Sequence, residues 1–521
     1  MAAGAVPLAG ELTVFCRPVV TARAVVRRDG TVLAGAWLPD LVRLGELERH
    51  LGDGVIEAIA DAAVEKGRLK PRQRRRLMSY PLVIRLMIAM ALMPDASYGE
   101  ALARLAGLLA DVPFALQWHV PTGKVVTEWR LLIPADMMED LFWHAAGPLV
   151  SDDEASAVML AGMMVCAADG MLVNLPDTPE NRGMFGSTGT ADDSSPFPQL
   201  RVVALTGRAG RAMLGAILGS SRAGEQTLLK RLAKRRPDLF AGRVTCFDRN
   251  FPGYGLITAI LDAGGHVVAR VGEGVALPLE PGGGWLPDGS RLTWLNAPSG
   301  RAEDRLPVRV TEHSAVMPRD DGKEKEEVSE TCTVITTLLD HDAAPADAVR
   351  ETYLTRWSAS ETTFGEDKTT IAGAGNRTSG PVLRSGSPRL VISEAWAWLT
   401  GTQLVRASAA AALRSGEAAA RALRRKDAAP VTADEESFTA CRHHMIRSMT
   451  STQVTATSSL EAIAAAADAA ARAALRTLNI PGRQRHSKRA QKARPKFVHT
   501  SATKKTVTGK PQVTVYAPGF S

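Results

Sequence analysis

The stretch 243-RVTCFDRNFPGYGLITAILDAGGHVVARV-271 decides the fold class of this chain. Its first residues form an apolar run that ends at Asp248 and predicts a buried strand, and residues 254–263 show the apolar spacing of a helix. A further strand is predicted at 266–271. A strand, a helix and a strand in such close succession are typical of a sheet with helices packed against it.

The residues upstream extend this pattern. Residues 159–177 predict a strand that ends at Asp169-Gly170, a common turn dipeptide, followed by a second short apolar run. Two runs at 200–207 and 212–219 predict a hairpin, and a helix is expected at 224–235. The fold class is therefore predicted to be α/β, with a mixed sheet and helices against it.

The regions on either side differ from this pattern in apolar spacing and in composition. Residues 41–115 and 122–150 have helical spacing, and the most apolar run, 82–93, is interrupted by Arg85 and too short to span a bilayer. Residues 272–332 are rich in Gly and Pro, and the sheet is expected to resume at 333–340. The expected division is an N-terminal segment (1–40), a helical domain (41–150), a core in two pieces (151–271 and 333–400), an inserted β-rich subdomain (272–332), an Ala-rich helical region (401–480) and a basic, disordered tail (481–521).

Positive charge is concentrated in two places. The net charge is +8, yet residues 483–505 alone hold nine Lys or Arg and no acid. A second cluster, 68-RLKPRQRRR-76, has six basic residues in nine. Such runs favour binding to polyanionic partners. The alternative for each run is a solvated segment that only aids solubility. The residues expected to contact DNA in these clusters are Arg72, Arg74, Arg75, Arg76, Arg483, Arg485, Lys488 and Arg489.

The cysteines and the N-terminus indicate a cytoplasmic protein. The five cysteines are scattered without the spacing of a zinc site, and their odd number argues against a disulfide framework. The N-terminus lacks a basic segment followed by an apolar run, so no signal peptide is expected. We therefore expect a soluble protein with no membrane partner.

Three acids stand out as candidates for metal chemistry. Asp169 and Asp248 come at the ends of predicted strands, and Glu361 lies in 353–371, which is predicted to be a helix with Lys368 two turns further on. Carboxylate oxygens suit Mg²⁺, which keeps substrate phosphates in its shell. A plain turn at Asp169-Gly170 and an ordinary charged surface helix at 353–371 remain alternatives.

Four short motifs, in order along the chain, resemble those of the DDE-class insertion-sequence transposases of the insertion element four family. They are Asp169-Gly170; Pro176-Asp177-Thr178 with Asn181 and Phe185-Gly186; Asp248-Arg249-Asn250-Phe251; and Tyr353, Arg356, Glu361 and Lys368. Residues 56–105 are also similar to the family's N-terminal domain. The resemblance covers roughly residues 20–400.

The resemblance implies an RNase H-like catalytic core with the β-rich insertion. Asp169, Asp248 and Glu361 would hold two Mg²⁺ ions, with Mn²⁺ as a substitute, for cleavage at mobile-element ends and transfer of the 3′-OH to target DNA. Partners would be double-stranded DNA, as terminal inverted repeats and target, and a second copy in a synaptic dimer at the bacterial nucleoid. Contacts to DNA are expected from Tyr353, Arg356, Lys368 and Arg249, and base stacking from Trp285 or Trp294, although a buried core position is the alternative for each Trp.

The chain departs from the family pattern at one point. Four residues separate Arg356 from Glu361, where the family has three. On a regular helix this puts Tyr353 and Arg356 on a different stripe from Glu361 and Lys368. A π-bulge, a changed role for Arg356 or a weakened active site would each accommodate it. The alternative functions are a DNA-binding protein derived from a transposase without catalysis, and a simple metal-dependent nuclease.

Overall fold

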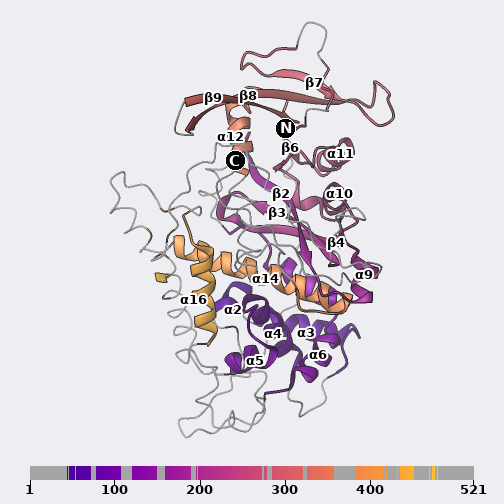
Figure 1. Ribbon diagram of the computed structural model, residues 1–521, viewed down its shortest axis with the longest axis vertical. Helices are drawn as coiled ribbons and strands as arrows, with labels where there is room; N and C mark the ends of the chain where they lie inside the picture. Colours follow the sequence, from indigo (N-terminus) through magenta and orange to yellow (C-terminus); the bar gives the residue numbers. More distant parts are fainter. Residues whose placement is uncertain are drawn as a thin grey trace, which may run out of the picture.

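A computed structural model gives the architecture of the chain (Figure 1). It describes residues 44–71, 78–106, 120–149, 159–188, 195–272, 275–278, 284–320, 325–356, 383–414 and 435–450, apart from residues 45, 53 and 196, together with isolated positions up to residue 478. A mixed sheet occupies the middle of the molecule, with the N-terminal helices at one end and the strands β7–β9 at the other (Figure 1).

The described strands form one sheet in the order β4-β3-β2-β5-β6-β9-β8-β7, with β1 attached to β2. The pairs β2–β5 and β5–β6 are parallel, and all the other pairs are antiparallel. The bounds are β1 Met159–Leu160, β2 Met163–Asn174, β3 Gln199–Gly207, β4 Met213–Ser220, β5 Arg243–Phe247, β6 His266–Arg270, β7 Arg291–Leu295, β8 Leu306–Asp320 and β9 Lys325–Thr336.

Apolar side chains on both faces of the sheet are covered by helices. On one face, Cys166 and Ala168 of β2 join a cluster with α10 (Glu225–Arg235) and α11 (Tyr254–Asp262). On the other face, α12 (Ala346–Arg356) covers Val165 of β2 and its neighbours on β5 and β6. Residues on alternate positions of a strand point to opposite faces, so β2 contributes to both clusters.

The helix α14 (Pro388–Leu413) joins the sheet to the N-terminal helices. It lies between the two in Figure 1, and its side chains share one core with Met171 and Val173 of β2. Gln403 fixes the contact, because its Oε1 accepts a hydrogen bond from Met213 N at 2.7 Å and its Nε2 donates to Gly147 O at 3.2 Å. A buried amide with both ends bonded stabilises the packing without an unsatisfied group.

The N-terminal helices pack around a buried, continuous apolar helix. They are α2 Glu46–Leu51, α3 Val55–Glu65, α4 Tyr80–Leu92, α5 Tyr98–Ala106, α6 Gly123–Leu132 and α7 Ala135–Ala145, and α16 (Phe438–Thr450) packs beside them. The side chain of Ser79 caps α4 by accepting from Leu82 N, and nearly every residue of this helix is buried. Arg85 of α4 is fully buried and forms ion pairs with Glu48 and Glu57.

Most of the predicted elements are confirmed. The hairpin of β3 and β4, the helices α10 and α11 and the strands β5 and β6 lie where the apolar patterns placed them, and the apolar run at 82–93 is the buried helix α4. Two predicted limits fall inside continuous elements. The strand β9 crosses residues 332 and 333, so the β-rich segment extends the main sheet, and α14 crosses residue 400.

The prediction that a strand ends at Asp169-Gly170 is wrong. Both residues lie inside β2, where Asp169 pairs with Ala204 and Gly170 with Val203 of β3. The turn lies earlier, at Ala161 and Gly162, which both have positive φ and connect β1 to β2. A Cβ at residue 170 would lie 2.6 Å from the side chain of Glu225 on α10, so a larger residue there would require this side chain to move.

Among the described residues, no helix combines the length and the apolar character needed to cross a bilayer.

Arg85→Met is expected to lower the free energy of unfolding by about 3–5 kcal/mol, because it leaves the buried carboxylate of Glu48 without its cation. Replacing both residues, as Arg85→Met with Glu48→Leu, should recover most of this loss. The matched control is Arg104→Met, which breaks an exposed pair with Glu100 and should cost under about 1 kcal/mol. Urea unfolding measures all three, and an Arg85→Met protein as stable as the wild type would contradict the prediction.

Candidate active site

The parallel pairing of β2 with β5 brings two carboxylates to the same level. The register runs from Met164 opposite Arg243 to Ala167 opposite Cys246. Two residues further along both strands come Asp169 and Asp248. Neighbouring strands lie about 5 Å apart, so extending this register by two residues brings Asp169 and Asp248 level on one face of the sheet. As predicted, Asp248 directly follows a buried strand.

The two acids lie on the face of the sheet that α12 and α14 cover. On β2, Val165 belongs to the cluster under α12, while Met171 and Val173 belong to the cluster under α14. Asp169 is on the same face, between these two groups. The polar site therefore lies at the boundary between the apolar cluster under α12 and the apolar cluster under α14.

Backbone amides orient both carboxylates. Gly170 donates its N–H to Oδ1 of Asp169 at 2.8 Å, and Arg249 donates its N–H to Oδ1 of Asp248 at 2.7 Å. A hydrogen bond from the following residue restricts rotation of a carboxylate without neutralising it. Oxygen donors held in this way fit a hard divalent cation such as Mg²⁺.

The last turn of α12 brings a cation to Asp248. Nη2 of Arg356 lies 4.0 Å from Oδ1 of Asp248, and the Arg356 side chain is 1% exposed. Its guanidinium also lies over the ring of Tyr353, with 5.6 Å between Cζ and the ring centroid. The two residues are three apart on one helix, so they share a face and act as one group.

Tyr353 remains a neutral phenol at physiological pH. Burial raises the pKa of Tyr353 to about 12, and the nearby positive charge of Arg356 opposes part of this effect. The hydroxyl can therefore donate a hydrogen bond to an anionic ligand.

Arg270 extends the row of charged residues, and the sequence analysis missed it as a candidate. Phe247 of β5 pairs with Ala269 of β6, so the next residues, Asp248 and Arg270, come level as well. Arg270 is close enough to Tyr353 for its charge to lower the pKa of the phenol. A charged residue at the end of an apolar strand is the signal that identified Asp248, and the same signal was available for Arg270.

The cysteines beside this row do not offer thiolate chemistry. Cys166 of β2 and Cys246 of β5 are fully buried. Burial raises the pKa of Cys166 to about 11 and raises the pKa of Cys246 as well. Because the thiolate is the nucleophile and the metal ligand, both side chains are inert at neutral pH.

A second acidic group lies in the connection from β9 to α12. In the part of the chain that the structure describes, Asp340, His341 and Asp342 are the group of metal-ligand side chains whose ligand atoms lie within 4.8 Å of one another. Oδ1 of Asp340 accepts hydrogen bonds from Asp342 N at 2.9 Å and Ala343 N at 3.3 Å, which holds a tight turn. The turn accounts for this cluster.

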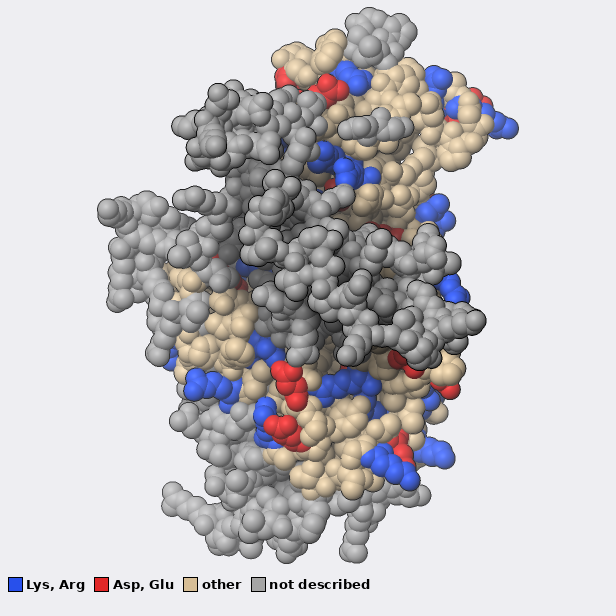
Figure 2. Space-filling model, in the orientation of Figure 1, with Lys and Arg blue, Asp and Glu red and all other residues tan. Residues whose placement is uncertain are grey.

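Several predicted site residues lie outside the described residues. These are Glu361, Lys368, Arg72, Arg74, Arg75, Arg76, Arg483, Arg485, Lys488 and Arg489. The predicted helix at 353–371 is described only as far as Arg356, and it begins earlier than expected, at Ala346. Arg249 is described and exposed, next to Asp248. Over the part of the face in Figure 2 that is not grey, Lys and Arg lie in separate groups with acids among them.

The two candidate tryptophans differ in exposure. Trp285 is 63% exposed, so a core position is wrong for this residue. Trp294 of β7 is partly buried, and the guanidinium of Arg305 lies 4.8 Å from its ring centroid. Trp285 is therefore the better placed of the two to receive a base.

The motif from Pro176 to Gly186 has a structural role. Thr178 caps α9 (Pro179–Phe185) by accepting from Asn181 N at 3.2 Å, and its hydroxyl donates to Gly386 O at 2.7 Å. Nδ2 of the buried Asn181 donates to Pro176 O at 3.1 Å and to Ser385 O at 3.2 Å. The motif thus fixes the chain just before α14.

The stability of the protein at alkaline pH should depend on Tyr353. Its folded-state pKa of about 12 exceeds the ordinary value of 10.0, so the stabilisation from this residue is complete below pH 10 and is lost as the pH rises towards 12. Wild-type protein should lose more unfolding free energy between pH 9 and about 11.5 than Tyr353→Phe does. Phenolate absorbance checks the cause, and a Tyr353 phenolate that forms near pH 10 in the folded protein would refute it.

Comparisons with known proteins find three similarities. Residues 41–143 match the family model described as "Insertion element 4 transposase N-terminal". The transposase InsG for insertion sequence element IS4, from Escherichia coli K12, is 25% identical over 362 residues, which cover 67% of this chain and 74% of that protein. A cryo-EM structure of the piggyBac transposase synaptic complex with hairpin DNA overlaps with a TM-score of 0.40 at 9% identity, over 78% of this chain and 79% of that chain. The family match over the N-terminal domain and the similarity to the Escherichia coli transposase together support an insertion-sequence transposase of the insertion element 4 family.

Proposed function

We propose that this protein is a DDE transposase, a polynucleotidyl transferase that cuts DNA at the ends of a mobile element and joins the freed 3′-OH to target DNA. The observation that carries the proposal is the parallel register of β2 and β5, which brings Asp169 and Asp248 level when it is extended by two residues. Arg356 of α12 faces the second of these acids. A pair of carboxylates beside a buried cation suits phosphodiester chemistry on a polyanion.

The catalytic core is proposed to be RNase H-like, formed by residues 151–271 and 333–400. In support, three antiparallel strands, β4, β3 and β2, are followed in the sheet by β5 and β6, parallel to β2. The β-rich insertion at 272–332 continues this sheet through β9 and β8. The helical domain at 41–150 and the regions at 401–480 and 481–521 complete the proposed division.

Asp169, Asp248 and Glu361 would hold two Mg²⁺ ions, for which Mn²⁺ could substitute. Bound ions would supply an activated attacking oxygen and a stabilised leaving oxygen for in-line displacement. The two aspartates would present carboxylate oxygens to the ions. Hydrogen bonds from the N–H groups of Gly170 and Arg249 fix the orientation of these carboxylates. Glu361 is proposed as the third ligand because it follows Arg356 by five residues.

The described residues on both sides of the segment that carries Glu361 contact the sheet that carries the two aspartates, which is compatible with this assignment. On the N-terminal side, α12 packs over β5 and ends beside Asp248. On the C-terminal side, Leu383 donates its N–H to the carbonyl of Asn174, the last residue of β2, at 3.0 Å. Ser385 is fixed by its own N–H, which donates to Glu394 Oε2 at 2.9 Å.

Cations around the acids would bind the phosphates of DNA. Arg356 has the fork of donors that matches a phosphate, and the Tyr353 hydroxyl next to it can donate a further bond. Arg270, level with Asp248, is placed to act with them. Arg249 and Lys368 are proposed as additional phosphate contacts, and Trp285 as the platform for a flipped base if a hairpin intermediate forms.

The partners follow from the chemistry. Terminal inverted repeats and target DNA are double-stranded, and two ends must be held together, so we propose a homodimer on DNA. The clusters at 68–76 and 483–505 would bind DNA outside the active site. The proposed place of action is the nucleoid in the bacterial cytoplasm.

Asp169→Asn, Asp248→Asn and Glu361→Gln should each abolish Mg²⁺-dependent cleavage of DNA that carries the flanking inverted repeats. We expect at least a ~100-fold loss of rate, since even residues that only support metal ligands are worth 10–100-fold. Binding to the repeats should remain. The measurement is nicking of labelled repeat DNA, with a gel-shift assay for binding.

The matched control is Asp262→Asn at the end of α11, which should cleave as the wild type does. Cleavage that survives Asp248→Asn would contradict the proposal. Repeat binding without any cleavage by the wild type would indicate a transposase-derived DNA-binding protein. Cleavage without preference for the repeats would indicate a simple nuclease.

Neutralising the first basic cluster should weaken DNA binding and its dependence on salt. In the variant with Arg72, Arg74, Arg75 and Arg76 all replaced by Ala, each lost phosphate contact should reduce the slope of log affinity against log salt by about 0.9. Fluorescence anisotropy over a range of salt concentrations measures the slope. Asp248→Asn serves as the control with an unchanged slope, and an unchanged slope in the arginine variant would exclude contact by this cluster.

A further inference from the structure

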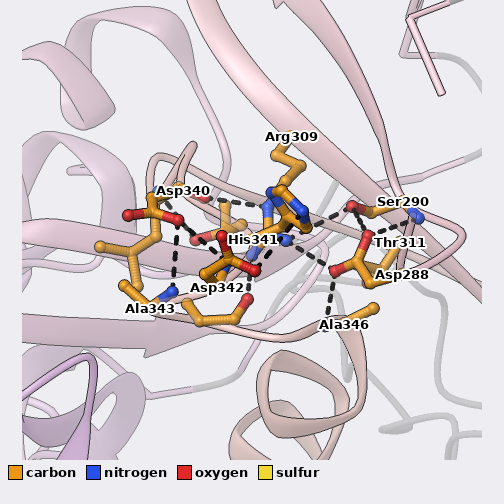
Figure 3. A network of polar contacts seen from close by, with 12 residues as sticks. Asp288, Ser290, Arg309, Thr311, Asp340, His341, Asp342, Ala343 and Ala346 are labelled. Carbon is orange, nitrogen blue, oxygen red and sulfur yellow. Dashed lines mark hydrogen bonds and ion pairs between the residues drawn. The ribbon is translucent and has the colours of Figure 1, made fainter. Parts of the chain in front are cut away.

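The N-terminus of α12 is held by an ion pair between a buried arginine and a partly buried aspartate, both from the β-rich segment. Arg309 of β8 is fully buried, and its Nη1 lies 2.9 Å from Oδ2 of Asp288, in the turn before β7 (Figure 3). The same Oδ2 accepts the N–H of Ala346, the first residue of α12, at 2.9 Å. Asp288 thus caps the helix from outside its own chain segment.

Arg309 also fixes the connection that leads into α12. Its Nε donates to Leu338 O at 3.0 Å, and its Nη2 donates to Ala344 O. One guanidinium therefore holds the residue two positions after β9 and the residue two positions before the helix. Because its charge is opposed by Asp288 and its donors are bonded to carbonyls, the buried cation is compensated.

Asp288 itself is rigid. Ser290 N donates to its Oδ1 at 3.0 Å, and the Ser290 hydroxyl donates to the same oxygen. Its pKa is lowered: burial opposes ionisation, but the hydrogen bonds from Ser290 and Ala346 and the charge of Arg309 outweigh it. The carboxylate stays ionised and keeps all these bonds at neutral pH.

We propose that Asp288, held by Arg309, is a positioning residue for catalysis: it sets the place of α12 along its axis and thereby the place of Tyr353 and Arg356 beside Asp248. The inference rests on the proposed function. The helix is 11 residues long, about 16 Å, so its capped end and its catalytic end move as one rigid rod. Arg356, at 4.0 Å from Asp248, has little room for displacement before the pair is lost.

Asp288→Ala tests the proposal in the full-length protein. The rate of Mg²⁺-dependent cleavage within the bound repeat complex should fall ~10–100-fold, the effect of displacing a reacting group by about 1 Å. Affinity for the repeats should stay within about twofold, because the basic clusters at 68–76 and 483–505, proposed to supply most of the phosphate contacts, are unchanged. A wild-type cleavage rate in the bound complex would overturn the proposal.

A second measurement reports the position of α12 and does not depend on cleavage activity. Burial holds the pKa of Tyr353 at about 12, so a displaced helix should lower it towards 10.0. The phenolate titration of Asp288→Ala, compared with Asp288→Ala/Tyr353→Phe, isolates this group. An unchanged Tyr353 titration in Asp288→Ala would also overturn the proposal.

The matched control is Asp304→Asn, another acid of the β-rich segment, whose carboxylate accepts from Ser299 Oγ at 2.6 Å. It should leave both readouts as in the wild type. If Asp288→Ala does not fold, Arg309→Lys replaces it: the cation remains, but a single amine cannot hold Leu338 and Ala344 together. The same selective loss of rate is expected, and a wild-type rate would overturn the proposal.

Comparing Asp248→Asn with Asp288→Ala distinguishes a failure of the proposed function from a failure of the positioning role. If Asp248→Asn cleaves normally, the proposed function fails, while the Tyr353 titration still reports whether Asp288 positions α12. If Asp248→Asn is inactive and Asp288→Ala cleaves normally, only the positioning role fails.

Discussion

The structure of the site depends on the parallel register between β2 and β5. A shift of one residue would move Asp248 to the opposite face, among the apolar residues under α10 and α11, because side chains alternate along a strand. The register is fixed by burial on both faces: Val244 and Cys246 belong to the cluster under α12, and Phe247 belongs to the other. The hydrophobic core thus determines where the carboxylates stand.

The sequence predicted this arrangement well where local patterns carry it. Asp248 was found because an acid directly after an apolar strand is costly unless it has a partner or a function. The hairpin of β3 and β4 and the helix α10 follow from periodicity alone. Asp169 was singled out as an acid at the end of a predicted strand and again by a family motif, but its position in the strand was predicted wrongly. A Gly after an Asp resembles a turn, and nothing local reveals that Glu225 packs against this glycine.

The rest required contacts between distant segments. Arg270 becomes part of the site only when β6 is placed beside β5, and Arg309 reaches carbonyls about 30 residues away in sequence. Gln403 of α14 bonds Met213, 190 residues earlier. Such pairings have no periodic signature, because hydrogen-bond geometry between separate elements depends on the final packing. Glu361 lies outside the described residues, so its place beside Asp169 and Asp248 stays a prediction.

The short turn from Trp285 to Arg291, closed by a bridge between these two residues, has a thermodynamic consequence. It carries an exposed indole at one position and the helix-capping Asp288 three residues later. A base stacked on Trp285 and a phosphate held by Arg356 would therefore act on one mechanical unit. If binding at one of these residues changes the affinity at the other, thermodynamic linkage requires the same factor in both directions. In such a unit, base stacking on Trp285 and phosphate binding by Arg356 would be two measures of one coupling free energy.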